Sequence, residues 1–179
     1  MRGERIGAMI GSIGGLIFVL INAGQLAAPV NTLVRVVGVL SFVAVVWFAV
    51  IRPSGAQGQA EPPSRQAIRV YGTSVTAMAL GIPVGAGLVN NVLHQPLLTV
   101  PWVVFVVGAH FLPFAAAFRA PVFARLGWTM IVLAVVGGVL ALTVTEAASP
   151  WTGVLGGIAL LGFSAAGSQQ ARPEAEPAR

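Results

Sequence analysis

The chain contains no cysteine, no lysine and no aspartate among its 179 residues. Without cysteine there is no disulfide framework, no thiolate metal site and no cysteine nucleophile. Without lysine a rhodopsin-like Schiff base is excluded. Without aspartate the chain also lacks the aspartate pairs with which a prenyltransferase holds magnesium diphosphate.

Charge is scarce as well, because only 8% of the residues are charged whereas 56% are hydrophobic, and the mean hydropathy is +0.88. This composition is typical of a chain surrounded by lipid, and it excludes a soluble globular core. The formal net charge of +5 comes from ten arginines against five glutamates. Because these arginines are scattered through short loops, we expect no nucleic-acid partner.

Six apolar stretches of about 20 residues are each long enough to cross the hydrocarbon core of a bilayer. The sequence therefore predicts an all-α polytopic transmembrane bundle, with three helical hairpins in one domain over residues 1–168. The segment 53–68, rich in Pro, Gly, Gln and Ser, is expected to be a flexible cytoplasmic loop, and 169–179 a disordered cytoplasmic tail. The predicted spans are 6–27, 32–51, 70–89, 97–118, 123–144 and 151–166.

The arginines predict how the chain is threaded through a bacterial cytoplasmic membrane. When six spans alternate, nine of the ten arginines fall on one side, and the positive-inside rule makes that side, with both termini, cytoplasmic. Trp47 and Trp128 then lie near the inner interface, and Trp102 and Trp151 near the outer one, as indole rings prefer. The first apolar run is too long for a cleaved signal peptide and has no clear small-x-small cleavage site.

Small residues recur at the spacing that lets helices approach closely in lipid, where burying leucine against leucine gains nothing. We expect these glycines to hold the bundle together through contacts within one chain. The alternative is a face for a second copy of the chain or for another membrane protein. The stripes consist of Gly7, Gly11 and Gly15, then Gly81 and Gly85, then Gly153 and Gly157.

Polar side chains gather toward the predicted outer side, where Asn22, Arg35, Asn90 and Glu146 would border an outward-facing vestibule. Arg35 is the lone arginine away from the cytoplasmic side, and Glu146 is the only carboxylate at its level. As functional groups, Arg35 would hold an anion and Glu146 would act as a gate or proton carrier. As structural groups they would form an ion pair at the interface, which is the interpretation we favour.

His110 lies deeper, within the fourth predicted span and three residues before Pro113. Pro113 in this span and Pro83 in the third each free a backbone carbonyl one turn earlier. Paired interruptions are typical of transport sites, which makes His110 a candidate substrate-binding residue. The alternative is an inert, kinked bundle in which the imidazole bonds a hydroxyl of Thr73, Ser74 or Thr76.

Neither a metal nor a cofactor is expected. The two histidines, His94 and His110, and the carboxylate of Glu146 show no spacing that places a pair of ligands on one helix face. His94 falls in a predicted outer loop, which makes it a weak candidate for a ligand.

The run PWVVFVVGAHFLPFAAAFRAPVFA from Pro101, together with GGLIFVLINAG from Gly14, resembles small uncharacterised integral membrane proteins of actinobacteria. The resemblance covers the six predicted spans and implies a shared architecture. It implies no activity, so it assigns no catalytic or binding residue.

Three functions stay open at this point, and we favour a non-enzymatic one. The leading hypothesis is a small-solute permease or channel whose substrate-binding residues are Asn22, Arg35, Asn90, Glu146 and His110. The second is a membrane-embedded enzyme acting on an isoprenoid or lipid, with Glu146 or His110 as catalytic residue and aromatic rings sheltering a carbocation. The third is an accessory or scaffold subunit whose glycine-rich faces bind a membrane partner or a second copy.

Overall fold

The computed structural model describes residues 2–48 and 64–169, with side chains for 7–48 and 64–166, and this part of the chain is helical throughout apart from its turns. A short 3-10 helix, η2 (Pro96–Leu98), precedes the fourth α-helix. The expected loop over 53–63 and the expected tail over 170–179 lie outside the described residues. The α-helices are α1 (Arg2–Ala23), α2 (Val30–Val46), α3 (Arg65–Asn91), α4 (Thr99–Ala117), α5 (Pro121–Thr143) and α6 (Ala148–Gln169).

Four helical stretches are long and apolar enough to cross a membrane, namely 65–91, 96–117, 121–143 and 148–166. α1 and α2 contribute shorter apolar helices, Gly7–Ala23 and Val30–Val46. Large apolar side chains also cover the outside, since Ile21, Leu33 and Val84 are 65%, 65% and 70% exposed. These helices indicate a multi-pass, membrane-embedded protein. That all six helices cross the membrane and that both termini are cytoplasmic stay predictions.

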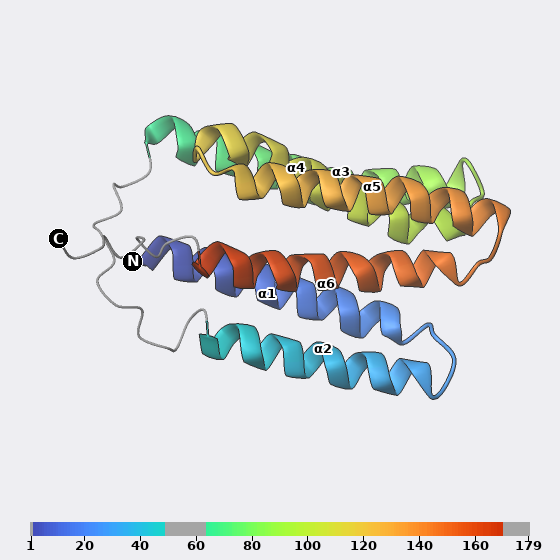
Figure 1. The fold of residues 1–179 in the computed structure, drawn as a ribbon. Helices are drawn as coiled ribbons and strands as arrows, with labels where there is room; N and C mark the ends of the chain where they lie inside the picture. Colours follow the sequence, from blue (N-terminus) through green and yellow to red (C-terminus); the bar gives the residue numbers. More distant parts are fainter. Residues whose placement is uncertain (1, 49–63, 170–179) are drawn as a thin grey trace.

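The helices run alternately in opposite directions and fall into two groups (Figure 1). One group consists of α3, α4 and α5, and the other of α1, α2 and α6. α6 contacts α4 and α5 as well as α1 and α2, so it joins the two groups. The most extensive contacts join α4 to α5 and α1 to α6. The chain-adjacent pairs α1 and α2, α3 and α4, and α5 and α6 also touch, but a division into three hairpins is not confirmed.

Local chemistry explains where helices begin and end. The hydroxyl of Ser64 accepts a hydrogen bond from the amide of Ala67 at 3.1 Å, which caps α3. α3 therefore begins at Arg65, so residues 65–68 of the expected loop are helical. α5 begins with Pro121 at a position where an amide hydrogen is not needed.

Reciprocal glycine contacts bring the closest helices together. A Cβ on Gly15 of α1 would lie 2.8 Å from the carbonyl oxygen of Gly157 on α6, and one on Gly157 would lie 2.6 Å from that of Gly15. Gly108 of α4 and Gly127 of α5 show the same relation, at 2.9 and 2.8 Å. These contacts lie within one chain, as the spacing of Gly15 and Gly157 predicted. The sequence did not predict that Gly108 and Gly127 would be contact positions between helices.

We expect Gly15→Val to lower the free energy of unfolding by about 1–3 kcal/mol, because overpacking a close contact costs about that much. Its Cβ would meet the Gly157 carbonyl and the side chain of Leu161. Gly14→Val is the matched control, since a Cβ there meets no atom within 4 Å. Thermal unfolding in detergent, followed by circular dichroism, compares the two. Equal melting temperatures would contradict a close approach of α1 and α6.

Candidate functional site

The five candidate binding residues lie on different elements and contact different neighbours. Asn22 is on α1, Arg35 on α2, Asn90 on α3, His110 on α4 and Glu146 in the turn between α5 and α6. Across the described side chains, no hydrogen bond or ion pair joins any two of the five.

Asn22 is the most deeply buried of the five, with 5% of its surface exposed. Its Nδ2 donates to the carbonyl of Phe18 at 2.8 Å, one turn earlier in α1. The amide group lies directly against Gly153 of α6, where any side chain in place of the glycine would collide with it. Its Oδ1 is buried and accepts no hydrogen bond from any described residue. A buried amide oxygen without a donor is costly, so this atom needs a polar partner.

Asn90 joins the end of α3 to the start of α4. Its Nδ2 donates to the Ala86 carbonyl at 2.7 Å and to the hydroxyl of Thr99 at 2.9 Å. As with Asn22, one of these bonds goes to the carbonyl four residues earlier. The Asn90 side chain therefore stabilises the connection through which η2 leads into α4.

Arg35 and Glu146 are both exposed. A guanidinium nitrogen of Arg35 lies near Gly24, so that a Cβ on this glycine would come within 2.7 Å of it. Arg35 therefore covers the end of α1. Neither residue forms an ion pair with any side chain that the structure describes, so the structure does not join Arg35 to Glu146.

The imidazole of His110 finds its partner in its own helix, because Nδ1 donates to the carbonyl of Val107. Phe111 and Phe114 flank the ring, with centroid distances of 4.1 and 5.4 Å. The hydroxyl of Ser74 on α3 does reach His110, but it donates to the backbone carbonyl at 2.8 Å. Ser74, one of the three hydroxyls predicted to bond the imidazole, thus bonds the backbone of His110 and not its ring.

Trp102 of α4 packs beside Pro83, which lies inside the continuous helix α3. Its indole N–H donates to the Gly81 carbonyl at 3.0 Å, and its ring occupies the space that a side chain on Gly85 would take. Sequence reasoning placed Trp102 at a membrane interface and missed this contact. The glycines on either side of Pro83 were the signal for it, because they leave room for a large ring.

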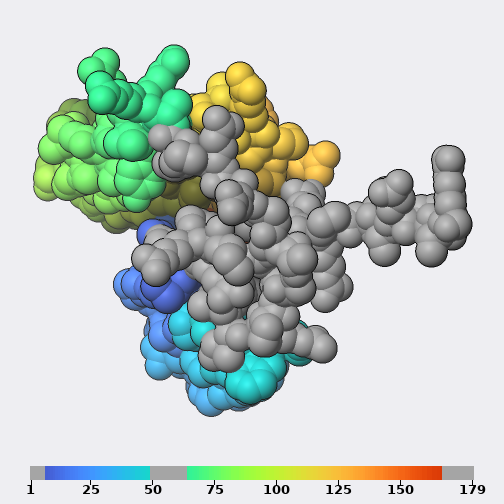
Figure 2. Space-filling model, turned by 90° about the vertical axis from the view of Figure 1, so that its left-hand side faces the viewer, coloured from blue at the N-terminus to red at the C-terminus, as the bar shows by residue number. Residues whose placement is uncertain are grey.

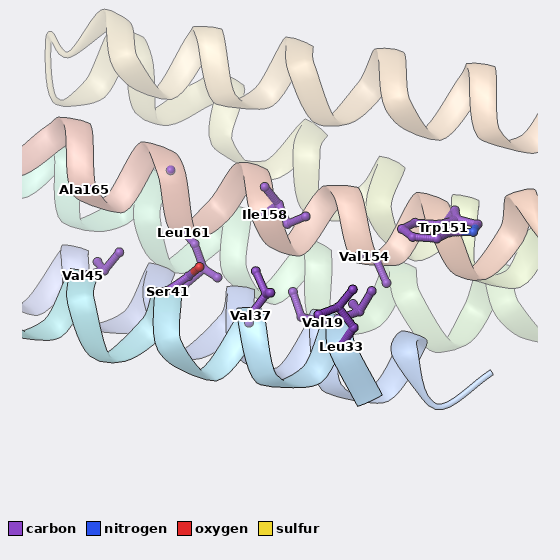
Figure 3. A pocket seen from close by; sticks show the side chains of 13 residues that line it. Val19, Leu33, Val37, Ser41, Val45, Trp151, Val154, Ile158, Leu161 and Ala165 are labelled. Carbon is purple, nitrogen blue, oxygen red and sulfur yellow. The ribbon is translucent and has the colours of Figure 1, made fainter. Parts of the chain in front are cut away.

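A groove that the sequence did not predict lies between α2 and α6, with α1 beneath it (Figure 3). Its volume is about 380 Å³, and aliphatic side chains dominate its lining. Ser41 adds a hydroxyl and Trp151 an indole N–H. The lining consists of Val19 from α1, Leu33, Val34, Val37, Gly38, Ser41 and Val45 from α2, and Trp151, Val154, Ile158, Leu161, Gly162 and Ala165 from α6.

The groove exists because α2 and α6 both rest on α1 and touch each other much less. At its floor Gly38 lets α2 approach Val19 of α1, and a Cβ on Gly38 would lie 2.5 Å from Cγ1 of that valine. On the other wall, a Cβ on Gly162 would meet no atom within 4 Å, so this part is open. From Leu33 to Val45 the groove follows about 18 Å of helix.

No protein-family model, curated protein or solved structure matches this chain. Two features of the structure bear on function, the groove and the unsatisfied oxygen of Asn22. The lining of the groove contains no carboxylate and no imidazole, because Glu146 and His110 lie elsewhere. Its side chains can hold an apolar molecule, but they offer no acid or base for catalysis.

We expect Trp102→Phe to lower the free energy of unfolding by about 1 kcal/mol, because it removes the hydrogen bond to Gly81 and leaves that carbonyl without the indole donor. Trp128→Phe makes the same chemical change on the outside of α5, where the side chain is 59% exposed, and serves as the control. Chemical unfolding in detergent measures both. A loss at Trp128 as large as that at Trp102 would contradict a special role for the indole contact.

Proposed function

We propose that this protein binds one acyl chain of a membrane phospholipid in the groove between α1, α2 and α6. The observation that supports this is the lining itself, which is aliphatic along one continuous path and has Trp151 near the end where α2 begins. Exposed side chains of α2 are apolar as well, since Leu33 is 65% exposed and Leu40 is 63% exposed. A lipid chain reaches such a site directly from the bilayer.

The shape of the groove favours a hydrocarbon chain over a helix of another protein. A helix with its side chains is about 10 Å wide, whereas α2 and α6 remain in contact with each other across the groove. The groove also runs along the helices, parallel to the acyl chains of a surrounding bilayer. A long, thin and flexible chain fits this space better than a second helix.

Contacts at the wall of the groove would hold the chain, because moving hydrocarbon out of lipid gives no hydrophobic gain. Affinity must then come from dispersion contacts with the lining and from a polar contact at one end. The indole N–H of Trp151 is a suitable donor for an ester or phosphate oxygen of the headgroup. The proposal therefore places the headgroup at the Trp151 end.

Filling the groove should release the lipid. In Gly162→Phe the new ring would enter the open part of the groove, whereas Gly72→Phe on α3 adds the same ring at another glycine with open space. We expect native mass spectrometry to find one phospholipid retained by the wild type and by Gly72→Phe, and a several-fold loss in Gly162→Phe. Retention of the same lipid by Gly162→Phe would contradict the proposal.

A second candidate function is passage of a small polar solute, and one observation favours it. The buried Oδ1 of Asn22 has no donor among the described residues, and a water or a solute hydroxyl would satisfy it. In this hypothesis Asn22 is one of a set with Arg35, Asn90, Glu146 and His110. The space for such a path would lie beside the contact between α1 and α6.

Stopped-flow light scattering on proteoliposomes tests this second candidate with water, urea and glycerol as probes. We expect permeation of one of them above that of empty liposomes, and its loss in Asn22→Leu, which removes the polar group. Ser164→Ala is a suitable control, since this hydroxyl bonds only the Leu160 carbonyl of its own helix. Rates equal to those of empty liposomes for all three probes would argue against a polar path.

A further inference from the structure

Four exposed arginines lie at one end of the group formed by α3, α4 and α5. Arg65 and Arg69 lie at the start of α3, Arg119 in the turn after α4, and Arg125 near the start of α5. Seen from that end, the starts of α3 (green) and α5 (yellow) both face the viewer in the upper half (Figure 2). Glu146, the one carboxylate among the described side chains, lies at the opposite end. No described acid therefore neutralises this cluster.

The arginine cluster stands on a packed aromatic base that joins the three helices. Tyr71 of α3 stacks on Phe114 of α4 at 5.5 Å, and Phe114 contacts Phe118 at 5.7 Å. Phe123 of α5 contacts Phe118 at 6.2 Å and stacks on Phe111 of α4 at 6.1 Å. The backbone beneath the arginines is thus held in place. Aromatic rings also favour the depth at which lipid headgroups lie.

Arg119 occupies a backbone conformation that suits glycine better than arginine. Its φ is 50°, in the left-handed region, and the turn is closed by the amide of Ala120 bonding the Ala115 carbonyl at 3.1 Å. Helix ends of this kind usually have glycine at the left-handed position. Closing the turn therefore does not explain an arginine here, and a backbone outlier of this sort points to a role for the side chain.

We propose that the arginines of this cluster, Arg65, Arg69, Arg119 and Arg125, bind the phosphate headgroups of anionic phospholipids. A guanidinium group donates two parallel hydrogen bonds to a phosphate, which makes arginine well suited to this contact. Basic clusters at the ends of membrane helices attract anionic lipids in the adjacent leaflet. The site is separate from the groove, which belongs to the other group of helices, so either proposal stands without the other.

Melting temperatures in nanodiscs test the proposal, with phosphatidylcholine alone compared with a mixture that includes phosphatidylglycerol. We expect phosphatidylglycerol to raise the melting temperature of the wild type. The double variant Arg119→Gly, Arg125→Gln removes two of the four guanidinium groups and should lose about half of this shift. Arg35→Gln removes the same kind of charge at the opposite end and should keep the whole shift. An unchanged shift in the double variant, or an equal loss in Arg35→Gln, would overturn the proposal.

Two further measurements separate lipid binding from its alternatives. Arg119→Gly alone should melt in phosphatidylcholine no lower than the wild type, since glycine fits a φ of 50°. A smaller phosphatidylglycerol shift in this variant then reports lost binding and not misfolding. Inorganic phosphate, added to the phosphatidylcholine nanodiscs, should produce no shift. A shift as large as that from phosphatidylglycerol would identify a soluble anion as the ligand and overturn the lipid assignment.

Discussion

The close approach of backbones at paired glycines is the interaction on which the rest of the structure depends. In lipid, apolar side chains gain little by facing each other, so helices are held by contact distances that only small residues allow. Gly15 with Gly157 and Gly108 with Gly127 provide these contacts for the two closest helix pairs. α2 then rests on α1 and only lightly touches α6, which leaves the groove between them, and α3 rests on α4, which brings the arginines of three elements to one end.

The lipid environment also explains why the polar residues do not gather into one site. A polar group within hydrocarbon must find a partner nearby, and the nearest acceptor is often a carbonyl of its own helix. Asn22, Asn90 and His110 all bond such carbonyls, three or four residues earlier. Trp102 occupies the space beside Pro83. Among the buried side-chain nitrogen and oxygen atoms of the described residues, only Oδ1 of Asn22 is left unsatisfied.

The sequence predicts the helices and their alternation well, because length, hydropathy and proline or serine at the ends are local properties. It also marks Gly15 and Gly157 as contact positions by their spacing. Which helices pair is not local, and every face of a uniformly apolar helix looks alike. The contact of Gly108 with Gly127 and the groove beside Gly38 therefore had no distinguishing signal. The sequence identified the polar candidate residues themselves. Their neighbours depend on which helices pack together, and the sequence does not show this.

The position of α6 between the two groups affects how the protein is made. Four helices separate α6 from α1 along the chain, yet α6 is the principal partner of α1. During synthesis the glycine face of α1 therefore stays unpaired until the four intervening helices have been made. The contact between α1 and α6 thus forms late, and a chain that stops before α6 would leave that glycine face open to the quality-control proteases of the membrane.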